Sequence, residues 1–85
     1  MSMWTEAEFI LPEQYTAKQI EDEAEKLFDC VSVSAKGKLA YISIGELSLM
    51  EAIRAVLEPL SKRFGFTFYI TGGHYYYDKR DKRKS

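Results

Sequence analysis

Hydrophobic and polar residues alternate with a period of two near the start of the chain, over residues 6–11. Such alternation predicts a half-buried β-strand. Ala7, Phe9 and Leu11 would face the core, and Pro12 would end the strand because proline has no N–H to donate to a neighbouring strand. The residues expected on the opposite side, if the strand begins early enough, are Trp4, Glu6, Glu8 and Ile10.

The same alternation occurs on both sides of Lys36-Gly37-Lys38, in residues 30–35 and 39–44. Two such runs joined by a short glycine-containing turn indicate a β-hairpin. The residues expected to face the core are Val31, Val33, Ala40, Ile42 and Ile44. Those expected on the other face are Ser32, Ser34, Leu39, Tyr41 and Ser43. This pattern favours an antiparallel sheet with one covered face and one face in solvent.

Apolar residues recur at helical spacing in two further stretches, each preceded by a capping box. Thr16 precedes Gln19 by three residues in the first helix, and Ser48 precedes Glu51 in the same way in the second. The apolar stripe of the first helix comprises Ile20, Ala24, Leu27 and Phe28. That of the second comprises Leu49, Ile53, Val56, Leu57, Leu60 and Phe64. We expect both amphipathic helices to pack on one face of the sheet.

Three local features refine the description of these helices. Pro59 lies inside the second helix, where it removes one hydrogen bond, so it predicts a kink or a break with a short final turn. Gly65 follows the last apolar position and predicts the end of that helix. Asp22 and Lys26 are four residues apart in the first helix, which predicts an ion pair between them.

Residues 66–78 contain six aromatic residues and the only histidine of the chain, arranged around Gly72-Gly73. Glycine readily adopts the positive φ of a tight turn, so this stretch predicts a second β-hairpin with the two glycines as its turn. One face of this hairpin would be core and would hold Phe68, Ile70, Tyr75 and Tyr77. The other would be surface and would hold Thr67, Tyr69, Thr71, His74 and Tyr76.

The predicted order of elements is therefore β-α-β-β-α-β-β, an α+β fold. Its first six elements match the split βαβ order of ferredoxin-like folds, with two helices on one face of an antiparallel sheet. We expect one domain over residues 1–78, because a chain of 85 residues supports a single hydrophobic core. Residues 79–85 have no apolar side chain to bury and are predicted to be a disordered basic tail.

The charge distribution and the cysteine content bear on the cellular compartment in which we expect the protein. The first thirty residues carry eight acidic and two basic side chains, whereas residues 65–85 carry two acidic and five basic ones. The single cysteine, Cys30, cannot form an internal disulfide, which favours a reducing compartment. The start of the chain does not resemble a signal peptide, and no apolar run is long enough for a membrane span. We expect a cytoplasmic protein with no membrane contact.

Few residues offer catalytic or metal-binding chemistry. His74 is the only histidine, and a zinc or similar site needs several ligands. A nucleophilic pair of Cys30 and His74 would require the fold to bring together two residues far apart in sequence. The acidic run Glu21-Asp22-Glu23, continued by Glu25, points in different directions around a helix and is typical of a solvated surface. We therefore predict no enzyme activity, no metal and no cofactor.

Residues 62–69, Lys-Arg-Phe-Gly-Phe-Thr-Phe-Tyr, resemble the RNP1 octapeptide of RNA-recognition motifs. Lys62, Phe64, Gly65, Phe66 and Tyr69 match that pattern, and Arg63 replaces its first glycine. The resemblance implies that exposed rings stack on RNA bases. It is confined to eight residues at the end of the second helix, whereas the family has this motif on its third strand. The other interpretation is that Phe64, Phe66 and Phe68 belong to the core.

Side chains on the open face and in the tail are the candidates for binding a partner. They are Tyr41, Tyr69, His74, Tyr76, Lys79 and Arg80. Tyrosine and arginine are enriched where binding energy concentrates in protein interfaces, so we expect a protein partner or a second copy in a homodimer. The alternative is a weak binder of RNA or single-stranded DNA, using the tyrosines and the basic tail. A sequence pI near 5.8 favours the protein partner, because nucleic-acid-binding domains typically have a pI above about 9.

Overall fold

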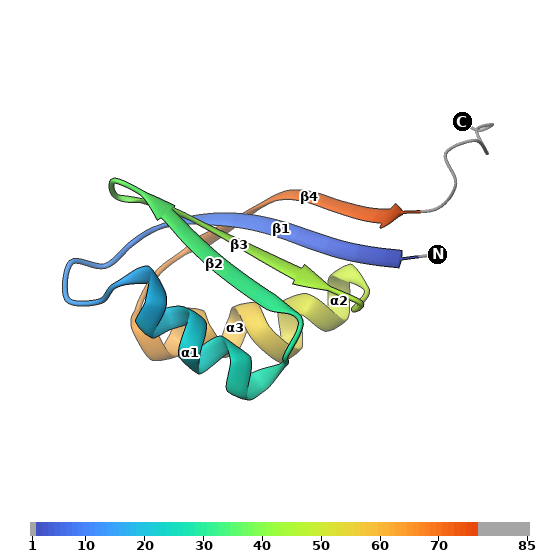
Figure 1. Cartoon of the computed structure of the whole chain (residues 1–85), viewed down its shortest axis with the longest axis horizontal. Coiled ribbons are helices and arrows are strands. Elements are labelled where there is room, and N and C mark those ends of the chain that lie inside the picture. Colours follow the sequence, from blue (N-terminus) through green and yellow to red (C-terminus); the bar gives the residue numbers. More distant parts are fainter. Residues whose placement is uncertain (1, 77–85) are drawn as a thin grey trace.

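The computed structural model describes residues 2–76 as an α+β fold with an open antiparallel sheet and two helical regions (Figure 1). The strands are β1 (Ser2–Ile10), β2 (Val31–Lys36), β3 (Leu39–Gly45) and β4 (Phe68–Tyr76). The first helical region is α1 (Ala17–Leu27). The second is a continuous run of α2 (Leu49–Ala52), the π-helical turn η1 (Ile53–Leu57) and α3 (Glu58–Phe64). Residues 1 and 77–85 lie outside this description.

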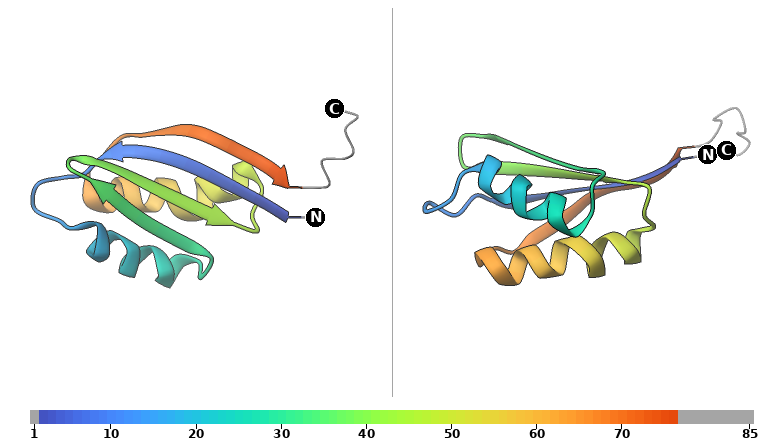
Figure 2. Two further views of the ribbon diagram at one scale, coloured as in Figure 1. Left: turned by 45° about the horizontal axis from the view of Figure 1, so that its top comes forward. Right: turned by 60° about the horizontal axis from the view of Figure 1, so that its bottom comes forward.

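The four strands lie in the order β2-β3-β1-β4, and every neighbouring pair is antiparallel. Both helical regions cover the same face of the sheet, as the two views of Figure 2 show, and leave the other face open. This arrangement confirms the predicted layers. Each strand consequently has one row of side chains toward the helices and one row toward solvent.

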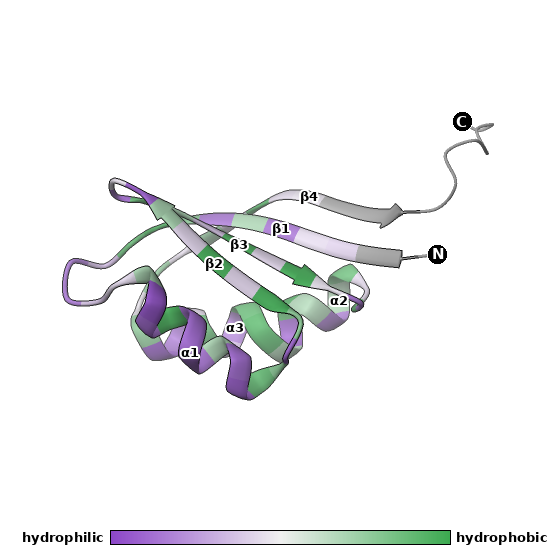
Figure 3. Ribbon diagram, viewed as in Figure 1, coloured by the Kyte–Doolittle hydropathy of each residue, from purple (hydrophilic) through white to green (hydrophobic). Residues whose placement is uncertain are grey.

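The core lies between the sheet and the helices and consists almost entirely of residues that alternate or recur as the sequence predicts. Both valines of β2 and the three apolar residues Ala40, Ile42 and Ile44 of β3 are buried, as are Ala7 and Phe9 of β1. Figure 3 shows the resulting alternation of hydrophobic and paler segments along β2 and β3. The helices contribute Ile20, Ala24, Ala52, Val56, Leu57, Leu60 and Phe64.

Both predicted capping boxes are present. The Thr16 hydroxyl accepts a hydrogen bond from the backbone N–H of Gln19 at 3.2 Å, and the Gln19 side chain accepts one from the backbone N–H of Thr16 at 2.8 Å. Ser48 and Glu51 make the same reciprocal pair, at 3.2 and 3.0 Å. These bonds use N–H groups that have no partner inside the helix, which fixes where each helix begins.

The helix around Pro59 neither breaks nor stops. The five residues Ile53–Leu57 form the π-helical turn η1, which Glu58 alone separates from the proline, and the N–H of Glu58 bonds to the carbonyl of Ile53, five residues back. A proline cannot donate the next bond, and widening the preceding turn allows the helix to continue past it. Gly65 then ends the helix with φ of +77°, as predicted.

The predicted hairpin at Gly72-Gly73 is wrong. Residues 68–76 form the single strand β4, which pairs along its length with β1, from Phe68 opposite Phe9 to Tyr76 opposite Ser2. The sixth and seventh predicted elements are therefore one strand, and the predicted order β-α-β-β-α-β-β has one strand too many. The physical reason is that β1 begins at Ser2 rather than near residue 6, so it offers backbone partners to eight of the nine residues of β4.

The glycine pair instead lies next to a β-bulge. Ile70 is opposite Ala7 and Gly72 is opposite Glu6, so Thr71 has no partner of its own in the register. An extra residue of this kind shifts the alternation of the strand by one position. Before the bulge the register agrees with the predicted faces of Phe68, Tyr69 and Ile70; beyond Gly72 the structure describes backbone positions alone, and Tyr77 lies outside the described residues.

Four smaller predictions also need correction. Leu27 and Leu49, the last residue of α1 and the first of α2, are 44% and 42% exposed, because the helix ends extend past the core. Ile70, predicted to be core, is 39% exposed because β4 is an edge strand. Asp22 pairs with Lys18 at 3.3 Å rather than with Lys26, which contacts Glu23 at 3.2 Å.

The two edges of the sheet differ. On the β2 edge, the carboxylate of Glu21 in α1 accepts a hydrogen bond from the backbone N–H of Val33 at 3.1 Å. This contact covers part of an edge that could otherwise pair with another strand. On the β4 edge, Tyr69 and Ile70 are exposed.

Candidate binding face

The open face of the sheet carries Tyr41 and Tyr69, two of the residues predicted to bind a partner. Its central row crosses all four strands: Ser34 of β2 lies opposite Tyr41 of β3, Tyr41 opposite Glu8 of β1, and Glu8 opposite Tyr69 of β4. Opposite residues share a face of a sheet. Tyr41 and Tyr69 therefore flank one carboxylate in a single row, although they are far apart in the sequence.

Large apolar side chains are exposed on this face. Tyr69, Ile10 and Tyr41 are 63%, 60% and 41% exposed. Ile10 lies in the row next to the tyrosines, opposite Leu39. Contiguous exposed apolar area is typical of surfaces that a partner covers.

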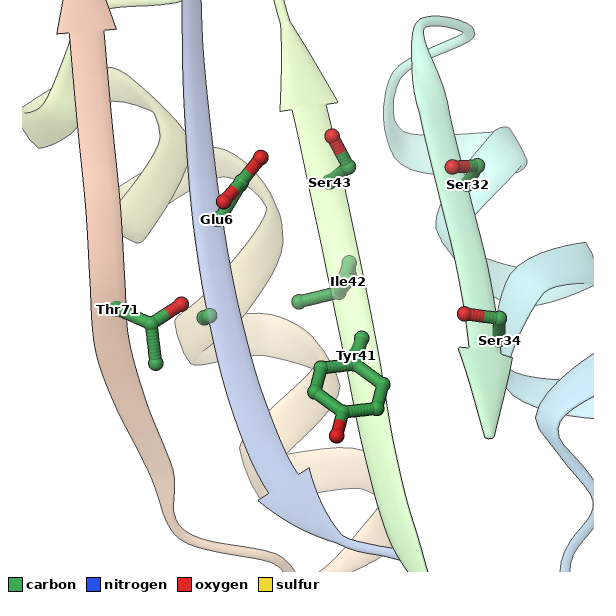
Figure 4. Close-up of a pocket in the computed structure, with 8 residues that line it drawn as sticks. Glu6, Ser32, Ser34, Tyr41, Ile42, Ser43 and Thr71 are labelled. Carbon is green, nitrogen blue, oxygen red and sulfur yellow. The ribbon is translucent and has the colours of Figure 1, made fainter. Parts of the chain in front are cut away.

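A hollow lies beside this row, toward the start of β1 (Figure 4). It has a volume of about 230 Å³ and is lined by residues of all four strands: Glu6, Ala7, Ser32, Ser34, Tyr41, Ile42, Ser43 and Thr71. Figure 4 views the open face, with the helices behind the strands. The hollow exists because the lining residues of β2 and β3 that belong to the open face are, apart from Tyr41, serines with short side chains.

The charge on this face is mainly acidic. Glu6 and Glu8 lie in neighbouring rows at its centre, and the Glu6 carboxylate accepts a hydrogen bond from the indole N–H of Trp4 at 3.1 Å. Among the strand positions of this face whose side chains the structure describes, Lys36 at the hairpin end of β2 is the one basic residue. A face of this composition attracts cations rather than phosphates.

The structure describes only part of the predicted set of binding residues. Tyr41 and Tyr69 are exposed on the open face, as predicted. His74 and Tyr76 lie in β4 opposite Trp4 and Ser2, and the structure describes their backbone positions alone. Lys79 and Arg80 lie outside the described residues, so their predicted role stays a prediction.

Of the residues that line the hollow, Tyr41 alone was among the predicted binding residues. The alternation of residues 6–11 already placed Glu6 and Glu8 opposite the core, and the hairpin pattern placed Ser32, Ser34 and Ser43 there too. What the sequence did not reveal is that β1 lies between β3 and β4, which brings these side chains together.

The surroundings of Cys30 favour the protonated form of its thiol. Burial raises the pKa of this thiol above its ordinary value, and the negative charges of Glu46 and Asp29 raise it further. The thiolate is the nucleophilic form of cysteine, so a raised pKa disfavours nucleophilic chemistry at neutral pH. Within residues 2–76, no three His, Cys, Asp or Glu side chains come together in an arrangement that could hold a metal ion.

Two aromatic rings of the RNP1-like segment lie in the core. Phe64 and Phe66 are buried, and the Phe66 ring stacks on that of Phe9 with centroids 3.9 Å apart. Phe64 packs edge-on against Tyr15 at 4.7 Å. Rings in these positions cannot stack on bases, so the implication of the RNP1 resemblance is wrong for Phe64 and Phe66. Among the aromatic residues of the segment, Tyr69 alone is exposed.

Comparisons of the chain with protein-family models, with curated proteins and with solved structures find no match. Among residues 2–76, no helix combines the length and the apolar character that crossing a membrane requires.

Proposed function

We propose that this chain is a small binding module without catalytic activity, which docks the open face of its sheet onto a protein partner or onto a second copy of itself. The observation that carries the proposal is the row of Tyr41, Glu8 and Tyr69, flanked by Ile10, on a face that neither helical region covers. Tyrosines and exposed aliphatic side chains around a few charges are typical of interface centres.

The alternative proposal is a weak binder of RNA or single-stranded DNA. The exposed rings of Tyr41 and Tyr69 favour it, because bases stack on aromatic side chains. Glu6 and Glu8 oppose it, since carboxylates among those rings repel the phosphate backbone. The basic tail that the alternative also needs lies outside the described residues. We therefore rank the protein partner first.

The experiment that tests the proposal compares two surfaces of the same protein. A Tyr41→Ala/Tyr69→Ala variant changes the open face, and an Arg54→Ala/Lys62→Ala variant changes exposed positions on the second helical region. Affinity capture from cells and light scattering over a range of concentrations measure partner binding and self-association. We expect the open-face variant to lose the association by 10-fold or more, in line with hot-spot tyrosines, and the helix variant to keep it. Equal behaviour of both variants would refute the proposal.

Two finer assignments accompany this proposal. The strand order β2-β3-β1-β4, with every neighbouring pair antiparallel and both helical regions on one face, supports a ferredoxin-like topology. A cytoplasmic location is supported by the single cysteine.

A further inference from the structure

The hollow around Glu6 offers an unusual density of hydrogen-bond acceptors. The hydroxyls of Ser32, Ser34 and Ser43 line it, and no hydrogen bond of theirs is present among residues 2–76. Each hydroxyl can accept as well as donate, and the Glu6 carboxylate has four lone-pair sites, of which the Trp4 indole takes one. Several acceptors therefore surround one negative charge.

This chemistry fits a planar cation. A guanidinium group presents five N–H donors in a fixed fork, and it forms bidentate pairs with carboxylates. The same group is attracted to the face of an aromatic ring, and Tyr41 lies at the rim of the hollow. The ammonium group of lysine has three donors around a point and cannot form the two parallel hydrogen bonds to a carboxylate that a guanidinium fork makes.

The surroundings indicate that the cation belongs to a larger molecule. Exposed Ile10, Tyr41 and Tyr69 lie close to the hollow on the same face, and a free amine or guanidine would leave them in water. A polypeptide that inserts one side chain into the hollow would cover them with its neighbouring residues. Glu8, between the two tyrosines, extends the negative charge along the path of such a segment.

We propose that the hollow formed by Glu6, Ser32, Ser34, Tyr41 and Ser43 receives the guanidinium group of an arginine in a partner protein. The proposal rests on the proposed function and names the chemistry of the partner: an exposed, arginine-containing segment. Charge complementarity selects this occupant, because the centre of the described face carries Glu6 and Glu8 and no basic side chain.

The test is an amide NMR titration of the full chain with a tetra-arginine peptide at low salt, with a tetra-citrulline peptide as the neutral control of the same shape. We expect saturating shifts at the amides of Glu6, Tyr41 and Ser43 with arginine and none with citrulline. Glu6→Gln should weaken binding about five-fold, as expected for one partly exposed ion pair. The glutamine keeps an oxygen for the Trp4 indole, so the local structure is preserved.

Glu25→Gln is the matched control, because it removes the same charge from an exposed position of α1, behind the sheet. It should leave the affinity of the arginine peptide unchanged. Equal losses in Glu6→Gln and Glu25→Gln would show attraction to net charge alone and overturn the inference. Equal shifts with citrulline, or shifts centred on α1, would overturn it as well.

The two proposals fail in different ways. If the arginine peptide leaves the hollow unperturbed while Tyr41→Ala/Tyr69→Ala abolishes association, the arginine site is wrong and the binding face stands. If the peptide binds at Glu6 while that double variant associates normally, the hollow binds guanidinium and the proposed function is wrong.

Discussion

Replacing Phe66 tests whether the aromatic segment after the second helical region is structural. Phe66 is 7% exposed, and its ring stacks on that of Phe9, which is itself 1% exposed, at an interplanar angle of 14°. Removing such a ring leaves a cavity that the sheet and helix can fill only in part. Phe66→Ala should therefore lower the free energy of unfolding by about 3–5 kcal/mol.

That loss is large for a chain of this size. The free energy of unfolding of a domain is only roughly 0.05–0.15 kcal/mol per residue, so it is small in a short chain. Phe66→Ala could leave the chain partly unfolded, so Phe66→Leu provides a second measurement. It keeps an apolar side chain in the site and should cost about 1 kcal/mol. Tyr69→Ala is the exposed control in the same segment and should cost about 0.5 kcal/mol, from its cross-strand contact with Glu8.

Urea unfolding followed by far-UV circular dichroism measures all three variants. The slope of the free energy of unfolding against urea concentration should be the same in all three variants, so that a shift in the unfolding midpoint reports a change in stability. The reasoning is refuted if Phe66→Ala costs under about 1 kcal/mol, or less than Tyr69→Ala, because a fully packed ring cannot be removed so cheaply. In that case Phe66 would be available for stacking and the RNA alternative would regain support.

Three further predictions concern individual contacts. Glu21→Ala should cost about 1 kcal/mol and accelerate hydrogen exchange at the Val33 amide, whose acceptor it removes; unchanged exchange would contradict the role of Glu21 on the β2 edge. Because the pKa of Cys30 is raised, its reaction with a disulfide reagent should increase at a higher pH than in the urea-unfolded chain, and coincident pH profiles would contradict the shift. Gly65→Ala should cost about 1 kcal/mol through its φ of +77° alone, since nothing lies within 4 Å of an added Cβ; calorimetry should show a lower melting temperature, and an unchanged one would contradict the strain.

Local patterns predicted most of the fold. The alternation of Val31 and Val33 with serines, the capping boxes at Thr16 and Ser48, and the stop at Gly65 each depend on a few neighbouring residues, and each is present. These features are encoded within one turn or one strand. They could therefore be predicted without knowing which strands pair.

The hairpin wrongly predicted at Gly72-Gly73 depends instead on residues far apart in the sequence. A glycine pair between β-forming runs suits a tight turn and also suits an irregular edge strand. The choice depends on β1, more than sixty residues earlier, which begins at Ser2 and pairs with β4 throughout. The hollow around Glu6 was hidden for the same reason, because it forms only when β1 lies between β3 and β4.

The central claim is that the open face meets a partner, and photo-crosslinking in living cells tests it most directly. Tyr69 is replaced by p-benzoylphenylalanine in one protein, and Lys62 on α3 is replaced in a second, since both positions are exposed. The account predicts discrete, light-dependent adducts from position 69 and none from position 62. Adducts from position 62 alone, or no adducts from position 69 at any expression level, would contradict it.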